Sequence, residues 1–528
     1  MIWVTPIPYD DPVLLFTPFA SDPVAALLDG PGAEDQSQDE AAQGVTVLAV
    51  DPFRVIVAGT EGVTVDGVLV DGDPFSILEQ ELARFRLPPV PPSLSIPLPI
   101  RFRTGAVGFF GYELGRHLER LPVPLIDGLG IPEMVVGLYD VIAVFDHQTR
   151  QAWVVASGFP ETEASTRAAR AEARTAVLIE RLIPASPDTD TSPVSGRDGG
   201  PARPCARSQG RGCARPASEG SLDVASSSLP LDAAPPDPRP KTIWHPDMDA
   251  AAYQNQVARI IEYIRAGDVF QANFTQRFHT DHPAGLTAFA LYRQVRARCP
   301  APFSAFLACG QGVHLASASP ERFVALDGDG RVQTCPIKGT RPRGATSDED
   351  QRLRQALVAS AKDRAENLMI CDLLRNDLGR VCCLGSIRVP QLAVARRFAS
   401  VHHLVSVVEG QLLPGVGPID LLRATFPGGS ITGAPKIRAM EIIHELEVAR
   451  RGPYCGAIAW IGFDGAMDSS IIIRTLVMAG DRVVAQAGGG IVADSDPVAE
   501  YQEMLTKISP LLALLGRRPD EVDDENLA

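Results

Sequence analysis

The stretch YQNQVARIIEYIRAGDVFQANFTQRF, residues 253–278, joins an expected helix directly to an expected strand. Its first part has apolar residues at helical spacing, and Gly267 and Asp268 form a stop signal. The part that follows has the apolar pattern of a strand. From here almost to the end of the chain the sequence remains that of ordered structure, with further strands after helices. The second half is therefore expected to mix helices and strands.

The first 180 residues are also expected to be folded. Apolar alternation predicts strands in GVTVLAV (44–50), RVIVAG (54–59) and VVGLYDVIAVF (135–145). A run rich in good helix formers, which begins at Glu161, predicts a helix. The proline-rich segment RLPPVPPSLSIPLP (86–99) indicates a connection between such elements.

A change of composition divides the chain. Residues 185–240 consist mainly of Pro, Ser, Gly, Ala and Arg, and such a segment cannot bury much apolar surface. We expect a disordered insertion or linker there. The predicted organisation is an N-terminal region over 1–184, the insertion over 185–240, a second folded region over 241–520 and a short acidic tail over 521–528.

Composition restricts the class of protein. The formal net charge is −15, which disfavours general nucleic-acid binding, so an anionic ligand must be met by a local cationic site. The nine cysteines are scattered without zinc-site spacing, which predicts reduced thiols. No basic leader precedes an apolar stretch, and no apolar run reaches the length of a membrane span. We expect a soluble cytoplasmic protein with no membrane or nucleic-acid partner.

Lys338 marks the first of four segments that differ from ordinary core. It lies in PIKGTRPRG (336–344), at the end of a strand that is expected to be buried, and Arg341 and Arg343 follow closely. Burial and repulsion by the two arginines would both lower the pKa of the amine and keep it available as a nucleophile or base. The alternative is a lysine whose stem is packed while its ammonium group reaches water, which is the better explanation of an isolated lysine.

The second segment, DRAENLMICDLLRNDLGRV (363–381), predicts a helix that ends near Gly379. Asp363 and Glu366 share one face of it. The alternative role for Glu366 is an ion pair with Lys362, four residues before it.

The third segment, FPGGSITGAPKIRAMEIIHELE (426–447), leads through a glycine-rich turn into a helix. Thr432 or Gly433 is expected near the N-cap and Pro435 in the first turn. Free backbone N–H groups there could hold a carboxylate or phosphate, although the spacing is not that of a Walker A loop. The alternative is a simple helix start.

The fourth segment, AQAGGGIVADSDPVAEYQEMLTKI (485–508), places three glycines after an expected strand, and then a helix that begins near Pro497. Glu500, Glu503 and Lys507 share one face of that helix. Together with Glu366 these carboxylates could hold Mg²⁺. The alternative is a solvated acidic face with a Glu503–Lys507 pair. The four segments together indicate a metal-assisted enzyme for a small anion, and the residues alone do not say which anion.

The same segments closely resemble the chorismate-utilising enzymes, a family that includes anthranilate synthase component I, aminodeoxychorismate synthase component I, isochorismate synthase and salicylate synthase. The similar motifs span essentially the region from Tyr253 to Leu515. They are SASPERF (317–323), PIKGTRPRG (336–344), ENLMICDLLRNDLGRV (366–381), FPGGSITGAPK (426–436), YCGAIAWIGFDGAMDSSIIIRTL (454–476) and AGGGIVADSDPVAEYQEM (487–504). GAVGFFGYELGRHLE (105–119) and PEMVVGLYDVIAVFDH (132–147) are similar to the aminodeoxychorismate and anthranilate branches. The resemblance implies an α+β fold, a two-layer sandwich of antiparallel sheets with outer helices.

Lysine in PIKGT resembles the aminodeoxychorismate synthases, whereas anthranilate synthases usually carry alanine there. In that branch the lysine amine attacks C2 of chorismate as the C4 hydroxyl leaves, and ammonia then attacks C4 and expels the lysine. By the same resemblance Glu321 is the general acid/base and His403, rather than the adjacent His402, lies near the ring. Glu366 and Glu503 would bind Mg²⁺, with Glu500 helping through water. Matching positions that would hold the substrate are Thr432, Tyr454, Arg474, Gly489, Gly490 and Lys507.

The resemblance also implies a partner. No glutamine amidotransferase domain is recognisable, so ammonia is expected from a separate glutamine amidotransferase subunit or from solution. The product, 4-amino-4-deoxychorismate, would lead towards p-aminobenzoate and folate. The alternatives are anthranilate synthase component I, the less similar isochorismate and salicylate synthases, and a non-catalytic regulatory homologue. The segment 18–30 lies where relatives hold a tryptophan-like ligand.

Overall fold

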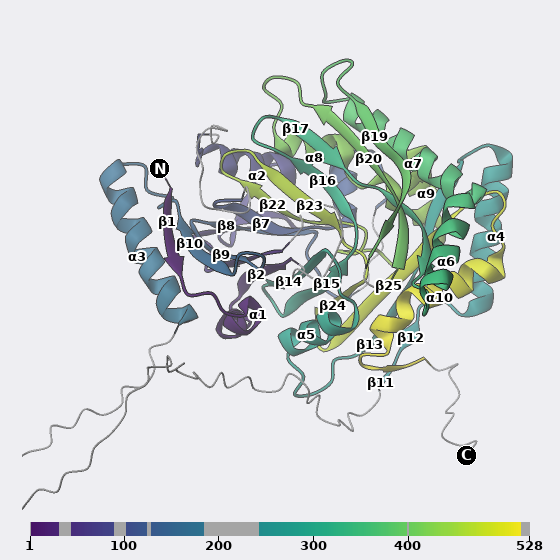
Figure 1. Cartoon of the computed structure of the whole chain (residues 1–528), viewed down its shortest axis with the longest axis horizontal. Coiled ribbons are helices and arrows are strands. Elements are labelled where there is room, and N and C mark those ends of the chain that lie inside the picture. The colour runs from purple at the N-terminus through teal and green to yellow at the C-terminus, as the bar shows by residue number, and fades with distance from the viewer. Residues whose placement is uncertain are drawn as a thin grey trace, which may run out of the picture. The chain divides into compact units, whose positions relative to one another are not determined.

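Two large antiparallel β-sheets organise the chain (Figure 1). The structure is a computed structural model, and it describes residues 2–30, 44–88, 102–123, 128–183, 242–398 and 401–518. Within these ranges each sheet has 12 strands.

The first sheet contains, in spatial order, β1 (Trp3–Ile7), β10 (Gln151–Ala156), β9 (Val141–Asp146), β3 (Val45–Val50), β2 (Val24–Asp29), β14 (Phe303–Cys309), β15 (Val313–Ser319), β24 (Thr475–Ala479), β25 (Arg482–Ile491), β13 (Gln271–Asp281) and β12 (His245–Pro246), with β21 (Gly433–Ala434) also paired to β13. The second contains β18 (Ile337–Pro342), β20 (Val401–Gln411), β17 (Arg331–Thr334), β16 (Arg322–Leu326), β23 (Met467–Ile471), β22 (Ala457–Gly462), β7 (Gly105–Phe110), β8 (Met134–Tyr139), β4 (Arg54–Gly59), β5 (Gly62–Val65) and β6 (Val68–Val70), with β19 (Arg388–Arg397) also paired to β20. Both sheets therefore combine strands from the two halves of the chain.

Helices and short elements complete the fold. The α-helices are α1 (Pro12–Leu15), α2 (Pro74–Ala83), α3 (Ala164–Leu182), α4 (Ala250–Ala266), α5 (Ala288–Arg298), α6 (Ser347–Ala359), α7 (Ala361–Gly379), α8 (Pro418–Thr425), α9 (Lys436–Leu446) and α10 (Pro497–Leu512). The 3₁₀ turns are η1 (Thr17–Phe19), η2 (Tyr112–His117) and η3 (Gly429–Ile431), and a small parallel pair joins β11 (Thr242–Ile243) to β26 (Gly516–Arg517).

Three apolar clusters show how the layers pack. One cluster joins the facing sides of the two sheets, for example Val47 and Ile142 of the first with Val107 and Ile458 of the second. On the outer side of the first sheet, α3, α4, α5, α9 and α10 bury their apolar faces. On the outer side of the second, α2, α7 and α8 do so. The predicted α+β sandwich of antiparallel sheets with outer helices is confirmed.

The helix and strand of residues 253–278 form as expected. Asp249 caps α4 by accepting a hydrogen bond from the backbone N–H of Ala252, and Gly267 ends the helix in the left-handed region at φ 86°. The apolar face of α4, including Tyr253, Val257 and Ile260, is buried. The chain then enters β13, which pairs with β25 over ten residues.

The strands predicted near the N-terminus are also confirmed, with one refinement. VVGLYDVIAVF forms two strands, β8 and β9, which belong to different sheets and separate at Asp140. Asp140 is fully buried, and Arg170 and Arg174 of α3 pair with its carboxylate. The two arginines compensate the charge of this carboxylate, which is buried where the chain passes from one sheet to the other.

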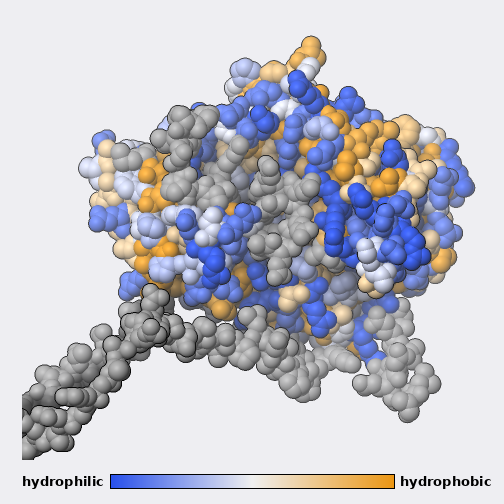
Figure 2. All heavy atoms as spheres, in the orientation of Figure 1, coloured by the Kyte–Doolittle hydropathy of each residue, from blue (hydrophilic) through white to orange (hydrophobic). Residues whose placement is uncertain are grey.

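Most of the proline-rich connection, the 185–240 insertion and the 521–528 tail lie outside the described residues. The predicted division of the chain therefore stays a prediction. Figure 2 shows a mainly hydrophilic face interrupted by apolar patches. In the part of the chain that the structure describes, we find no helix long and apolar enough to cross a bilayer.

Candidate functional site

Lys338 lies in β18 at an irregularity of the strand. The pairing of β18 with β20 shifts register between Lys338 and Thr340, and Gly339 between them has φ 80°, which glycine adopts without strain. The Lys338 amine donates a hydrogen bond to the backbone carbonyl of Ser430 at 3.1 Å. Burial lowers the pKa of Lys338, although Glu366 and Glu321 oppose this effect.

The expected source of cationic repulsion on Lys338 is wrong. Arg341 pairs with Asp363 and Arg343 pairs with Asp350, so both arginines are neutralised locally. The cation that lowers the pKa of Lys338 is instead Lys507, which comes from α10. The sequence analysis was right that a nearby cation lowers the pKa of Lys338, but it named the wrong cations. The aspartates that pair with Arg341 and Arg343 lie on later segments, and their contacts could not be read from the sequence.

Glu321 lies between β15 and β16 and is buried at 6% exposure. Burial raises the pKa of its carboxyl group, while a hydrogen bond from the Ser430 side chain and the nearby Lys338 oppose the rise. Lys338 and Glu321 therefore meet at Ser430. The sequence analysis missed Ser430 as a site residue, although it lies in the FPGGSITGAPK segment.

Each of the three glutamates expected to bind a metal ion lies close to a lysine. Lys362 lies 4.0 Å from Glu366 on α7 and 3.6 Å from Glu500 on α10, measured between nitrogen and oxygen. Glu503 pairs with Lys507 at 2.8 Å. Among the described residues, no group of three or more His, Cys, Asp or Glu side chains is arranged to hold a metal ion as it stands.

The surroundings of these carboxylates differ. Burial raises the pKa of Glu366, and Lys338 and Lys362 partly offset it. Lys507 lowers the pKa of Glu503. Glu500 accepts a hydrogen bond from the hydroxyl of Ser495 at 2.6 Å. Since Glu366, Glu500 and Glu503 all raise the pKa of Lys362, the three carboxylates surround one region.

The glycine triplet 488–490 lies inside β25, not after a strand as the sequence suggested, because β25 stays paired with β13 through Ile491. A Cβ atom on Gly489 would lie 3.1 Å from Glu500 Oε2 and 3.6 Å from Lys507 Nζ. On Gly490 it would lie 2.4 Å from Gln271 Nε2. The lack of side chains lets α10 bring Lys507 close enough to donate to the Gly488 carbonyl at 3.0 Å.

His403 and Arg474 form a second part of the site. His403, in β20, shares a hydrogen bond of 2.8 Å between its Nδ1 and the hydroxyl of Thr340. Burial, with help from Arg474, lowers the pKa of His403 to about 4, so its ring is neutral near pH 7. His402 instead contacts Asp350 at 2.9 Å.

Arg474 is a cation without a carboxylate partner within the described ranges. Burial lowers its pKa, and the Cys299 thiol opposes this effect. A partly buried arginine that has no carboxylate partner is suited to bind the anionic group of a ligand.

Thr432 and Tyr454 are less directly connected to Lys338. The hydroxyl of Thr432 donates to the Gly428 carbonyl at 3.0 Å, within its own loop. Tyr454 is buried, and the groups that influence its pKa are Cys455, Arg451 and Glu447. The expected cap of α9 is also wrong: the N-cap is Pro435, since Gly433 and Ala434 form β21 and pair with β13.

A separate cavity of about 80 Å³ lies beside Leu28, Asp29 and Gly30, with Pro302, Phe303 and Ser304 across from them. The segment suggested for a tryptophan-like ligand thus lines a cavity, and its occupant stays a prediction.

The chain is similar to several known proteins. Aminodeoxychorismate synthase component 1 of Klebsiella aerogenes is 39% identical over 502 residues, which cover 94% of this chain and 95% of that protein. Anthranilate synthase component 1 of Streptomyces coelicolor is also 39% identical, over 84% of this chain and 78% of that protein. The crystal structure of anthranilate synthase component I from Streptococcus pneumoniae matches 91% of this chain and 95% of its own, with a TM-score of 0.70 and 29% identity. The family profile of chorismate binding enzymes matches residues 205–513, and the chain belongs to this family.

Proposed function

We propose that the chain is the chorismate-converting component of an aminodeoxychorismate synthase. The observation that carries the proposal is the pairing of Lys338 with Glu321 at Ser430. The pKa of the lysine is lowered and that of the glutamate is raised, so both groups are shifted towards their neutral forms. A neutral amine is a nucleophile, and a neutral carboxyl group is a proton donor.

The proposed reaction uses both groups. The Lys338 amine forms a bond to C2 of chorismate, the ring double bond shifts, and the C4 hydroxyl leaves as water with a proton from Glu321. Ammonia then bonds to C4, the double bond shifts back, and the C2–N bond breaks to release the lysine. The net change is chorismate plus ammonia to 4-amino-4-deoxychorismate plus water.

Other residues would hold the substrate. Arg474, which has no carboxylate partner among the described residues, suits a carboxylate of chorismate. Neutral His403, fixed by Thr340, would lie near the ring. Lys507 and the space left by Gly489 and Gly490 would accept a further part of the substrate, and Thr432 and Tyr454 would complete the pocket wall.

Glu366, Glu500 and Glu503 fit Mg²⁺ by the chemistry of their donor atoms, because hard carboxylate oxygens are its preferred ligands. Bound there, Mg²⁺ would neutralise the ring carboxylate. Glu503 would have to release Lys507, and Glu500 and Glu366 would have to turn from Lys362. Ammonia is proposed to come from a separate glutaminase subunit, which the component 1 names of the relatives suggest.

Anthranilate synthase component I remains the second candidate, because a relative with that name reaches the same 39% identity. Lys338 favours the first candidate. The test is to incubate the pure protein with chorismate, Mg²⁺ and ammonium at mildly alkaline pH and to identify the product by mass. A product that an aminodeoxychorismate lyase converts to p-aminobenzoate supports the proposal, whereas anthranilate refutes it in favour of the second candidate.

A further inference from the structure

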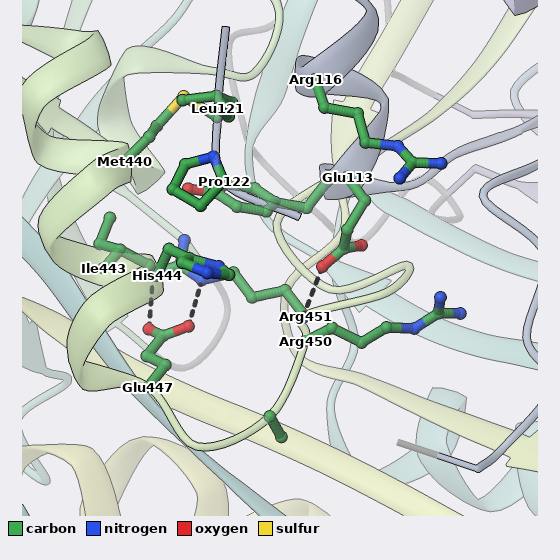
Figure 3. A pocket seen from close by; sticks show the side chains of 12 residues that line it. Glu113, Arg116, Leu121, Pro122, Met440, Ile443, His444, Glu447, Arg450 and Arg451 are labelled. Atoms are coloured by element: carbon green, nitrogen blue, oxygen red, sulfur yellow. Dashed lines mark hydrogen bonds and ion pairs between the residues drawn. The ribbon is translucent and has the colours of Figure 1, made fainter. Parts of the chain in front are cut away.

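A buried ion pair between Arg451 and Glu447 lies close to the loop that carries Ser430. Arg451 is 2% exposed, and its guanidinium donates from Nε to Glu447 Oε2 at 2.9 Å and from Nη2 to Glu447 Oε1 at 2.7 Å. Figure 3 shows this pair at the wall of a small cavity between η2 and α9.

The same guanidinium holds two backbone carbonyls. Nη1 donates to the carbonyl of Ile431 at 2.8 Å, and Nη2 donates to the carbonyl of Asn273 at 2.6 Å. Ile431 directly follows Ser430, the residue at which Lys338 and Glu321 meet. Arg451 therefore fixes the η3 loop against β13, one peptide away from the groups proposed to react.

Arg451 is itself anchored from several elements. Its backbone N–H donates to Glu113 Oε1 at 2.8 Å, which is the third contact marked in Figure 3. Its carbonyl accepts from Gln486 Nε2 of β25 at 3.0 Å. Glu447 also accepts from the backbone N–H and the hydroxyl of Thr275 in β13, at 3.0 and 2.8 Å. A side chain restrained in this way can transmit little movement to the loop.

We propose that Arg451, oriented by Glu447, is a positioning residue for the reaction: it sets the place of the Ser430 peptide and thereby the distance between Lys338 and the substrate. The inference rests on the proposed roles of Lys338 and Glu321. Only a guanidinium can make these contacts together, because its planar fork offers five donors, whereas an ammonium is a single point of charge.

The test compares Arg451→Lys with a matched control, Arg103→Lys. Arg103 is also buried and pairs with the carboxylate of Asp464, in the turn between β22 and β23. Chorismate consumption with ammonium gives kcat and KM, and thermal unfolding gives Tm, for both variants of the full chain. We expect Arg451→Lys to lower kcat about a hundredfold, as a misplacement of roughly 1 Å at the reacting groups does. KM for chorismate should change little, and Arg103→Lys should lower Tm without lowering kcat.

An unchanged kcat in Arg451→Lys, with a Tm loss like that of the control, would overturn the proposal, because the pair would then be structural only. If Arg451→Lys does not fold, Glu447→Gln is the second test, since its one remaining oxygen can still accept from Thr275 while the charge and one of the two bonds from Arg451 are lost: a lowered kcat supports the proposal and an unchanged one overturns it. The identity of the wild-type product is measured separately, so an error in the proposed reaction is recognised independently of the kcat comparison.

Discussion

The amine of Lys338 and the carboxyl group of Glu321 both approach one residue, Ser430. The backbone carbonyl of Ser430 accepts from the amine at 3.1 Å, and the Ser430 side chain lowers the pKa of the Glu321 carboxyl group. The nucleophile and the proton donor of the proposed reaction are therefore held in register by a single residue of the η3 turn. Substitutions at these three residues should have separable effects.

Replacement of Lys338 tests the covalent step. We expect Lys338→Ala to lower formation of the aminated product by roughly three orders of magnitude or more, because the nucleophile is lost. Lys338→Arg is the matched comparison, since its guanidinium keeps the charge but does not lose a proton near neutral pH. The product is measured by mass spectrometry, and full activity of either variant with an unchanged product would remove the covalent role.

Ser430→Ala separates the two partners, because alanine keeps the backbone carbonyl for Lys338 and removes the hydroxyl from Glu321. That hydroxyl lowers the pKa of Glu321, so its loss raises the pKa. The limb of the kcat/KM profile that reports Glu321 should then move to higher pH. The limb that reports Lys338 should stay in place and serves as the internal control; a profile in which neither limb moves would contradict the role of Glu321.

Glu366→Gln and Glu503→Gln test the metal site. Each variant would remove one charged oxygen of the proposed ligand set, so the Mg²⁺ concentration for half-maximal rate should rise by at least about tenfold. Glu441→Gln, which changes an α9 carboxylate paired with Arg438, is the control. Identical Mg²⁺ titrations in all four proteins would exclude Glu366 and Glu503 as ligands.

His403 should make the protein sensitive to acid. Its pKa is about 4 in the folded protein and 6.5 when unperturbed, so between these pH values the unfolded chain binds a proton that the folded chain does not. The free energy of unfolding should therefore fall as pH decreases, by about 2 kcal/mol from pH 7 to pH 5 for this group.

His403→Gln should remove that part of the loss. Urea unfolding at both pH values measures it, with His245→Gln, at an exposed histidine, as the control. An equal loss in wild type and His403→Gln would show that His403 is not the group responsible.

Local signals in the sequence predicted a large part of the fold. Gly267 ends α4 and Pro497 begins α10, both as expected, because helix boundaries depend on neighbouring residues. Contacts between distant segments were not accessible in this way. The pairing of Gly433 with Ala272 moved the start of α9 to Lys436, and nothing near residue 433 specifies that partner.

For the candidate site, too, the sequence indicated individual residues but not the contacts between them. The motifs indicated Lys338, Glu321 and the glutamates of α7 and α10 by residue type. They did not reveal that Asp363 and Asp350 neutralise Arg341 and Arg343, or that Ser430 joins Lys338 to Glu321. Such relationships depend on the packing of elements that are distant in the sequence, and local side-chain spacing does not encode that packing.

Because each sheet combines strands from both halves of the chain, neither sheet can be completed until the second half has been synthesised. β7 pairs with β22 from Gly105 opposite Gly462 to Phe110 opposite Ala457. A ribosome that adds roughly 5–20 residues per second needs about 20–70 seconds to make the chain between them. During that time the edge of the apolar strand β7 that pairs with β22 has no partner strand. We therefore expect the nascent chain to rely on chaperones that cover strand edges, and the amino-terminal half to aggregate when it is produced alone.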